Sequence, residues 1–306
     1  MSRFSSSSSK IGRFVARNEG RLMSGFVREA AAKGMQRPLV RYIVRNMVPV
    51  RHPDRWLFIV GCYNSGTTIL RRVLESHPQI AGLPYEGVQM TDAFPDLEAG
   101  GWPRMMYSNR DSWNMPDTDS PEIVKKAMRD WSLWWPRGAD VFLEKSIDHT
   151  TRIGWTSTYF PNSCFVAITR NGYCVCEGIR RRASPVGDAR LEVGTSYPLD
   201  LLGKQWAAFD DEIVGALAKV PNSMTIKYED LISNPVENVE KIFDLVKVEH
   251  VSLEFNQQVL DVDGIKHELL NQNEASLSRL SAEDKSELTP IIRNSLLRNG
   301  YEVLSE

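Results

Sequence analysis

The sequence lacks long apolar runs, and none approaches the roughly 20 residues that an α-helix needs to span a bilayer. Its start is basic and serine-rich, with no apolar core of the kind found in secretory signals. Over 306 residues, 42% are hydrophobic and 25% are charged, which is typical of a globular protein. We therefore expect a cytoplasmic protein with one large α/β domain or two small ones.

Cysteine is also scarce, and the positions of the four cysteines do not have the spacing of a zinc site. Disulfides are rare in the cytosol, and a cysteine in an apolar context is most often a free buried thiol. Neither a metal site nor a disulfide is therefore expected at Cys62, Cys164, Cys174 and Cys176.

Net charge is nearly absent, at −2, but the two signs are unevenly distributed. Residues 1–51 contain 11 Lys/Arg and 2 Asp/Glu, whereas residues 52–306 contain 26 Lys/Arg and 37 Asp/Glu. We accordingly divide the chain into a basic, partly helical N-terminal arm (1–51) and an α/β domain (52–306).

Within this arm, the apolar residues of RPLVRYIVRNMV recur at helical spacing, with Arg41 and Arg45 on another face. The apolar residues are Leu39, Tyr42, Ile43 and Met47. Such a helix either lies on an anionic membrane surface or another polyanion, or packs on the domain as an ordinary surface helix. Peripheral membrane contact is one of these two interpretations, and no nucleic-acid partner is expected.

Four apolar runs have the length and β-branched content of buried parallel strands, and a helical pattern follows each. They are WLFIVGC, DVFLEK, CFVAITR and SMTIKYEDL. This alternation predicts a doubly wound α/β fold, in which ligands bind at the carboxyl ends of the parallel strands. Residues 61–68, Lys145, Arg170 and Tyr228 should therefore share one edge of the sheet.

The segment from Met90 to Asp119 has no hydrophobic period, because Pro, Gly, Trp, Met, Asn and Asp mix in it. A long irregular segment in a compact domain is usually a lid or a substrate-binding loop, and local disorder is the alternative. We interpret it as a loop over the active edge of the sheet.

The sequence GCYNSGTT at residues 61–68 follows a predicted strand and opens a predicted helix. It matches the phosphate loop G-x-x-x-x-G-K-[ST] except that Thr67 replaces the lysine. Backbone N–H groups and hydroxyls of residues 65–68 would face an anion at the helix start. A helix cap made by Ser and Thr is the structural alternative. Without the lysine, one phosphate with a different leaving group beyond it fits better than a nucleoside triphosphate.

The chain resembles the sulfotransferases that use 3′-phosphoadenosine 5′-phosphosulfate (PAPS). Their phosphosulfate loop reads [KR]-S-G-T-[ST] after a strand, and NSGTTILRRVLESHPQIAG resembles it. FLEKSIDH, YFPNSCFVAITRNGYCVCEGIRRR and MTIKYEDLISNPVENVEKIFDLV resemble later blocks in the same order, and LSAEDKSELTPIIRNSLLRNGYE resembles the last helices. The resemblance covers most of the chain from about Trp56 to Tyr301. It implies a three-layer P-loop-like fold with a central parallel sheet flanked by helices, PAPS as donor, 3′-phosphoadenosine 5′-phosphate (PAP) as product, and no metal.

Two residues depart from the family pattern. The basic residue that begins the family's loop and supports the sulfonate during transfer is Asn64 here. The family also pairs an arginine with a serine eight residues later to bind the 3′-phosphate; Arg170 matches the arginine, but Gly178 stands at the serine position. The neighbouring Arg180, Arg181 and Arg182 could compensate or could be solvated on a helix surface.

The resemblance implies a set of site residues. Asn64, Ser65, Gly66, Thr67 and Thr68 would hold the 5′-phosphosulfate, and Asn64 would also be catalytic, in place of the family's basic residue. Arg170 and Gly178 would lie at the 3′-phosphate.

The other implied roles involve single residues. Glu86 would be the catalytic base, with His149 as an alternative, and Lys145 would neutralise the sulfonate. Tyr228 would contact adenine, and Arg279 would be a phosphate contact. Each also has a purely structural interpretation, as a surface carboxylate, a strand-end or helix-start residue, a buried aromatic or a solvated arginine.

Three functions remain open at this stage. The first is sulfonate transfer to a hydroxyl or amine of a carbohydrate, glycolipid or small metabolite. The second is an ATP-dependent small-molecule kinase, which the missing loop lysine disfavours. The third is a non-catalytic nucleotide-binding descendant of the fold, which Asn64 and Gly178 favour.

Overall fold

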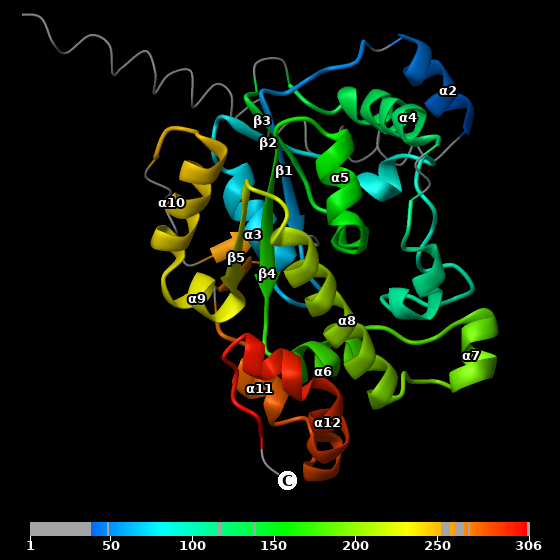
Figure 1. The fold of residues 1–306 in the computed structure, drawn as a ribbon, viewed down its shortest axis with the longest axis vertical. Coiled ribbons are helices and arrows are strands. Elements are labelled where there is room, and N and C mark those ends of the chain that lie inside the picture. The colour runs from blue at the N-terminus through cyan, green and yellow to red at the C-terminus, as the bar shows by residue number, and fades with distance from the viewer. Residues whose placement is uncertain are drawn as a thin grey trace, which may run out of the picture.

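The structure is a computed structural model, and it describes residues 38–47, 49–115, 118–136, 139–251, 258–260, 266–268 and 270–304. Its centre is a parallel sheet with the strand order β2-β3-β1-β4-β5 (Figure 1). The strands are β1 (Arg55–Val60), β2 (Ile80–Gly82), β3 (Val141–Glu144), β4 (Ser163–Thr169) and β5 (Ser223–Lys227). The predicted α/β fold with a central parallel sheet is confirmed. The edge strand β2 was not predicted.

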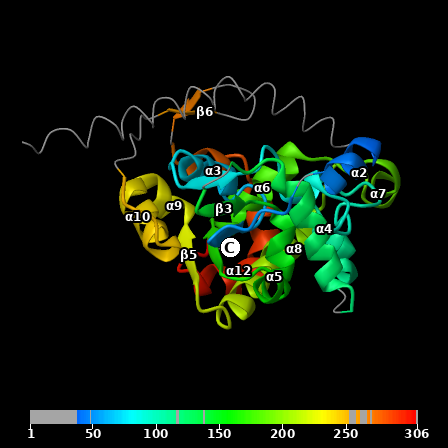
Figure 2. The same ribbon diagram turned by 90° about the horizontal axis from the view of Figure 1, so that it is seen from above.

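Side chains of β1 alternate between the two faces of the sheet, and helices cover both faces. Leu57 and Ile59 pack with α3 (Thr67–Glu75), α9 (Tyr228–Ser233) and α10 (Pro235–Val246). Trp56 and Phe58 pack with the opposite layer. This second layer consists of α4 (Ser120–Ser132), α5 (Ile153–Tyr159) and α8 (Leu199–Leu217), which lie on the other side of the sheet from α3 (Figure 2). Burial of β1 on both faces explains why its sequence is a continuous apolar run instead of an alternating one.

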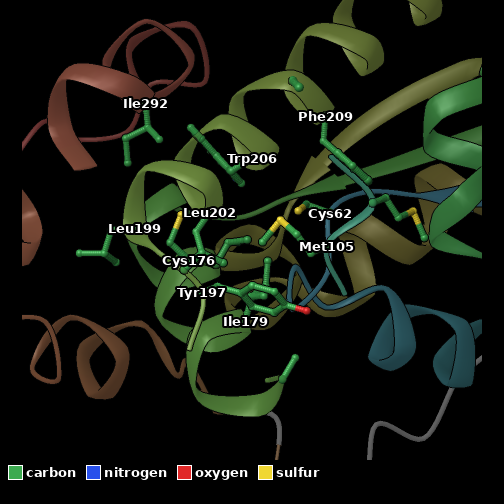
Figure 3. Packing of buried hydrophobic residues seen from close by; sticks show 14 of the residues in the cluster. Cys62, Met105, Cys176, Ile179, Tyr197, Leu199, Leu202, Trp206, Phe209 and Ile292 are labelled. Carbon is green, nitrogen blue, oxygen red and sulfur yellow. The ribbon is translucent and has the colours of Figure 1, made fainter. Parts of the chain in front are cut away.

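A further apolar cluster lies beyond the carboxyl ends of the strands (Figure 3). It joins α8 to α6 (Gly172–Arg182) and α12 (Ala282–Arg298), and its members include Trp206, Phe209 and Ile292. Apart from a helix of the N-terminal arm, the remaining described elements are η1 (Gly87–Met90), η2 (Met106–Ser112), η3 (Ile147–Arg152), α7 (Gly187–Val193), β6 (Gln258–Leu260), β7 (Lys266–Glu268) and α11 (Asn273–Leu277). The cluster gives the helices beside the active edge a fixed position relative to the sheet.

The described part of the segment after Met90 is irregular but packed. Leu97, Trp102, Met105 and Trp113 are buried in the same apolar cluster. The Trp113 indole donates a hydrogen bond to the Met106 carbonyl at 3.1 Å. Its aromatic and Met residues therefore anchor the segment to the domain. A search for hydrophobic periods cannot detect such anchors, because they do not recur at a regular spacing.

The predicted helix of the arm is present as α2 (Pro38–Met47), and residues 1–37 of the arm lie outside the described residues. Its polar side faces the domain, where Arg45 pairs with the buried Asp130 at 2.7 Å and Arg41 and Arg45 both pair with Asp92. Its apolar side is exposed, with Leu39 70%, Tyr42 67%, Ile43 46% and Met47 78% accessible. None of the helices in the described ranges is long and apolar enough to cross a membrane.

Candidate active site

A cavity of about 820 Å³ opens at the carboxyl ends of the parallel strands. Its lining contains ten of the predicted site residues, namely Asn64, Gly66, Thr67, Thr68, Glu86, Lys145, Arg170, Gly178, Tyr228 and Arg279. Ser65 is buried and does not line the cavity. Residues separated by up to about two thirds of the chain thus meet at the predicted edge of the sheet.

The phosphate loop reverses direction tightly between β1 and α3, and two of its glycines make this possible. Gly61 has φ 152°, and a Cβ there would lie 2.5 Å from the Ile168 carbonyl oxygen. Gly66 has φ 98°, and a Cβ there would lie 2.8 Å from the Tyr228 ring. Thr67 and Thr68 begin α3, whose first N–H groups have no intrahelical acceptor. The helix start therefore offers backbone donors and a favourable dipole to an anion in the cavity.

Arg170 follows β4 and joins the loop to the far side of the cavity. Its Nη1 donates to the Asn64 carbonyl at 2.9 Å, and its Nε donates to Asn273 Oδ1 at 2.8 Å. Although the residue is 93% buried, its Nη2 has no hydrogen-bond partner among the described residues. A buried, unpartnered guanidinium donor beside a cavity is suited to an anionic ligand.

Tyr228 begins α9 with its ring under the Arg170 guanidinium, 4.4 Å from ring centroid to Cζ. Its hydroxyl donates to the Leu270 carbonyl at 3.0 Å and accepts from the Gln272 N–H at 3.3 Å. Tyr228 lines the cavity with only 2% of its surface exposed, and its hydroxyl is already paired. This arrangement suits contact with an aromatic base through the ring, and adenine contact remains a prediction.

The proposed base and cation meet each other directly. Lys145 Nζ forms an ion pair with Glu86 Oε1, and both side chains line the cavity. Glu144, at the end of β3, accepts hydrogen bonds from the Gly87 N–H at 2.6 Å and the Ser146 N–H at 3.1 Å. Gly87 follows Glu86 and Ser146 follows Lys145, so the buried Glu144 holds the backbone immediately after each member of the pair.

His149 is fully buried and does not line the cavity. Its Nε2 lies 3.1 Å from Glu144 Oε2, and its Nδ1 lies 3.4 Å from Thr156 Oγ1. The ring therefore supports Glu144 from behind, which favours the packing role over that of an alternative base.

Asp148 is a cavity residue that the sequence did not single out. Burial raises its pKa to about 6, against the opposing effects of Arg152 and His149, and Glu86 raises it further. Arg152 Nη2 lies 3.8 Å from the Asp148 carboxylate. A second carboxylate thus stands near Glu86, and no sequence motif marks it.

The arginines after Gly178 differ in their surroundings. Arg180 makes two 2.9 Å hydrogen bonds to Asp284, and Arg181 pairs with Glu177 at 2.9 Å. Arg182 instead reaches Asn64, with Nη1 at 3.4 Å from Oδ1. Arg104, which the sequence did not mark either, reaches the same oxygen at 3.1 Å. Arg182 and Arg104 thus bring positive charge to the side chain of Asn64, at the loop position where the family carries a basic residue.

The lining of the cavity contains two sets of charged side chains. The cationic set consists of Arg104, Lys145, Arg170, Arg181, Arg182 and Arg279. The carboxylates, which we call the carboxylate wall, are Glu86, Asp92, Asp96, Glu98 and Asp148. The cationic set suits an anionic donor, whereas the carboxylates suit a group that donates hydrogen bonds.

Among the described residues, no group of three or more His, Cys, Asp or Glu side chains could hold a metal ion. All four cysteines are free and buried. Burial raises the pKa of the Cys62 and Cys174 thiols to about 12, so neither is a reactive thiolate at neutral pH.

Comparison with known proteins supports the same family that the motifs suggest. A family model described as "Sulfotransferase family" matches residues 40–252, which is more than half of the chain. No curated protein matches the chain in sequence.

Several solved structures share the fold at low identity. Sulfotransferase STF1 from Mycobacterium tuberculosis has a TM-score of 0.52 at 14% identity, covering 90% of this chain and 85% of that one. STF9 from Mycobacterium avium has a TM-score of 0.51 at 14% identity, covering 86% and 81%. The sulfotransferase domain from the curacin biosynthetic pathway has a TM-score of 0.51 at 18% identity, covering 83% and 100%.

Proposed function

The chain belongs to the sulfotransferase family, and we propose that it transfers the sulfonate group of PAPS to a hydroxyl group of a carbohydrate, glycolipid or small metabolite. The observation that carries the proposal is the convergence on one cavity of a lysine-free phosphate loop, Arg170 with an unpartnered guanidinium nitrogen, and the Glu86–Lys145 pair. These groups supply, respectively, a phosphate-binding loop, a hydrogen-bond donor for a phosphate, and a base with its adjacent cation.

In the proposed reaction, Glu86 accepts the proton of the acceptor hydroxyl as the oxygen attacks the sulfur of PAPS. The new O–S bond forms in line with the breaking bond between sulfur and the phosphate-linked oxygen, and PAP leaves. Lys145 already contacts Glu86. A sulfonate group that is attacked beside Glu86 would therefore place its oxygens near the positive charge of Lys145. Fixed donors around those oxygens cost little reorganisation during the transfer.

The carboxylate wall supports a hydroxyl-rich acceptor. Tyr63 donates its hydroxyl hydrogen to Glu98. Burial raises the pKa of Tyr63 most, and the negative charges of Glu98, Asp148 and Glu86 raise it further, which shows that these carboxylates lie near one another. Carboxylates accept hydrogen bonds, so this wall suits several hydroxyls of one acceptor, or an amine. An anionic acceptor would be repelled here.

A kinase function has less support. The loop has no lysine for the β- and γ-phosphates. The choice between an enzyme and a non-catalytic descendant is an activity question. Incubating the native protein with PAPS labelled in its sulfonate group and a fractionated cell extract tests it, because label should move to an extract component. Absence of transfer from every fraction, despite PAP binding, would favour the non-catalytic descendant.

We also propose that an anionic membrane surface covers α2. The polar side of the helix is held to the domain by the ion pair with buried Asp130, so its apolar side cannot turn inward without breaking that pair. The basic residues that precede α2 in the sequence complement anionic lipid. Because Asp92 both anchors α2 and lines the cavity, a membrane at α2 would present acceptors near the carboxylate wall.

A further inference from the structure

The amide of Asn64 is the point on which two otherwise unpaired arginines converge. Arg104 comes from the irregular segment and Arg182 from the end of α6, and both donate to Asn64 Oδ1. No ion pair within the described ranges involves either arginine. Their charges are therefore not neutralised there, and both line the cavity.

The fold holds Arg104 in place on both sides. Its backbone has φ 59°, a left-handed conformation that costs free energy for an arginine and persists only where neighbours enforce it. The buried Gln205 of α8 donates to the Arg104 carbonyl at 2.9 Å and accepts from the Tyr107 N–H at 3.2 Å. The Tyr197 hydroxyl donates to the Pro103 carbonyl at 2.8 Å.

The next residue, Met105, is fully buried in the apolar cluster of Figure 3. Arg104 is thus a charged side chain that lines the cavity and whose neighbours along the chain are held by Gln205 of α8 and by Tyr197. A side chain fixed by its backbone in this way loses less conformational entropy when it binds a ligand.

The surroundings of Asn64 favour an anion at this place. Asn64 Nδ2 is buried without a hydrogen-bond partner among the described residues, as is Arg170 Nη2. Arg182 has its pKa lowered by burial and then by the neighbouring charges of Arg181, Arg104 and Arg170. Such mutual repulsion between arginines is relieved when an anion binds between them.

We propose that Arg104 is a catalytic residue that supplies, from outside the phosphate loop, the cation that the loop lacks at position 64. Asn64 orients the guanidinium through its side-chain oxygen, and Arg104 contacts the sulfonate and the oxygen that becomes the leaving group on PAP. As the bond between sulfur and that oxygen breaks, negative charge grows on the oxygen, and the fixed guanidinium stabilises it. The inference rests on the proposed sulfotransferase function.

The test uses PAPS and PAP as probes and needs no known acceptor. In Arg104→Gln, affinity for PAPS should fall about ten-fold while affinity for PAP changes less than about three-fold, because only PAPS carries the sulfonate. Release of labelled sulfate from PAPS, with water as acceptor, should fall about 100-fold. Arg104→Lys keeps the charge and should retain most of both properties. Arg110→Gln is the matched control, since Arg110 lies in the same segment, packs on Tyr107 and Trp113, and does not line the cavity.

Rescue distinguishes a catalytic charge from a structural one. Asn64→Lys alone would place a third cation against Arg104 and Arg182 and should not improve turnover. In the double variant Asn64→Lys/Arg104→Gln, the lysine should raise the rate of sulfate release at least ten-fold above that of Arg104→Gln alone.

Two results would overturn the inference while leaving the proposed function intact. One is unchanged PAPS affinity and sulfate release in a folded Arg104→Gln protein, and the other is a double variant no more active than Arg104→Gln. A native chain that binds neither PAPS nor PAP would instead overturn the proposed function, and this inference with it.

Discussion

The side chain of Asn64 lies directly against Gly178. A Cβ atom on residue 178 would stand 3.2 Å from Cβ, Cγ and Nδ2 of Asn64. The two residues that depart from the family pattern are therefore neighbours in space, although 114 positions separate them in the sequence. Each departure accommodates the other: the asparagine occupies space that a serine at 178 would need.

Gly178→Ser should consequently destabilise the protein by about 1 kcal/mol, because the extra atoms force Asn64 to move. The loss should disappear in the double variant Asn64→Gly/Gly178→Ser, since glycine also suits the left-handed φ of 60° at position 64. Urea unfolding of the native protein, both single variants and the double variant measures this coupling. Gly215→Ser is the control, because a Cβ there meets nothing within 4 Å. Additive effects of the two substitutions would show that the residues do not constrain each other.

Glu86→Gln should lower sulfonate transfer by about 100-fold, because it retains size and hydrogen bonding but removes the base. Lys145→Ala should also lower turnover, by about 3 kcal/mol in activation free energy, since the cation beside the sulfonate is lost. Transfer of labelled sulfonate to the acceptor fraction of a cell extract measures both, and PAP binding by each variant serves as the folding control. Native turnover in both variants would remove this pair from the mechanism.

Asp148 should make stability depend on pH. Its pKa is raised from the ordinary value of 3.8 to about 6 in the folded protein, so the folded state binds the proton more tightly than the unfolded chain. The resulting stabilisation is complete below pH 3.8 and is lost as the pH rises from there through 6. A shift of about two pKa units corresponds to at most about 3 kcal/mol.

Asp148→Asn has no such titration. Its unfolding free energy relative to the native protein should therefore rise between pH 4.5 and pH 7.5, as measured in urea at both pH values. The constant cost of leaving buried Arg152 without its neighbour cancels in this comparison. A difference that stays the same at the two pH values would contradict the raised pKa.

The exposed face of α2 should bind vesicles that contain anionic lipid. Replacing Tyr42 and Met47 by serine should reduce sedimentation with such vesicles several-fold, and added salt should weaken binding by the native protein. Leu297→Ser is a matched control, because Leu297 is 57% exposed on α12, far from α2 in Figure 1. Equal sedimentation of all three proteins would assign the apolar face to another occupant, such as a second copy of this chain or residues 1–37.

The sequence predicted those parts of the structure that depend on local pattern. The strands that end before Gly61, Lys145 and Arg170 are buried on two faces and therefore appear as continuous apolar runs. The edge strand β5, which ends before Tyr228, is only partly buried, and its sequence SMTIK mixes polar with apolar residues. β2 escaped notice because it has only three residues, one of them glycine.

Other parts depend on contacts between distant segments. Arg104 could not be foreseen, because it meets Asn64 across 40 residues through a segment without period. Asp148 is unusual only through its burial. An amphipathic helix usually turns its apolar side toward the domain, but α2 turns its basic side inward, because Arg45 pairs with the buried Asp130.

Calorimetric titration with PAP in the presence of a metal chelator tests the central claim most directly. The phosphate loop and Arg170 provide hydrogen-bond donors for the phosphates of PAP. The native protein should therefore bind PAP with a dissociation constant on the order of micromolar, and Arg170→Ala should bind it at least ten-fold more weakly. Tight binding of ATP that requires magnesium, with no heat from PAP, would contradict the sulfotransferase assignment and favour a kinase.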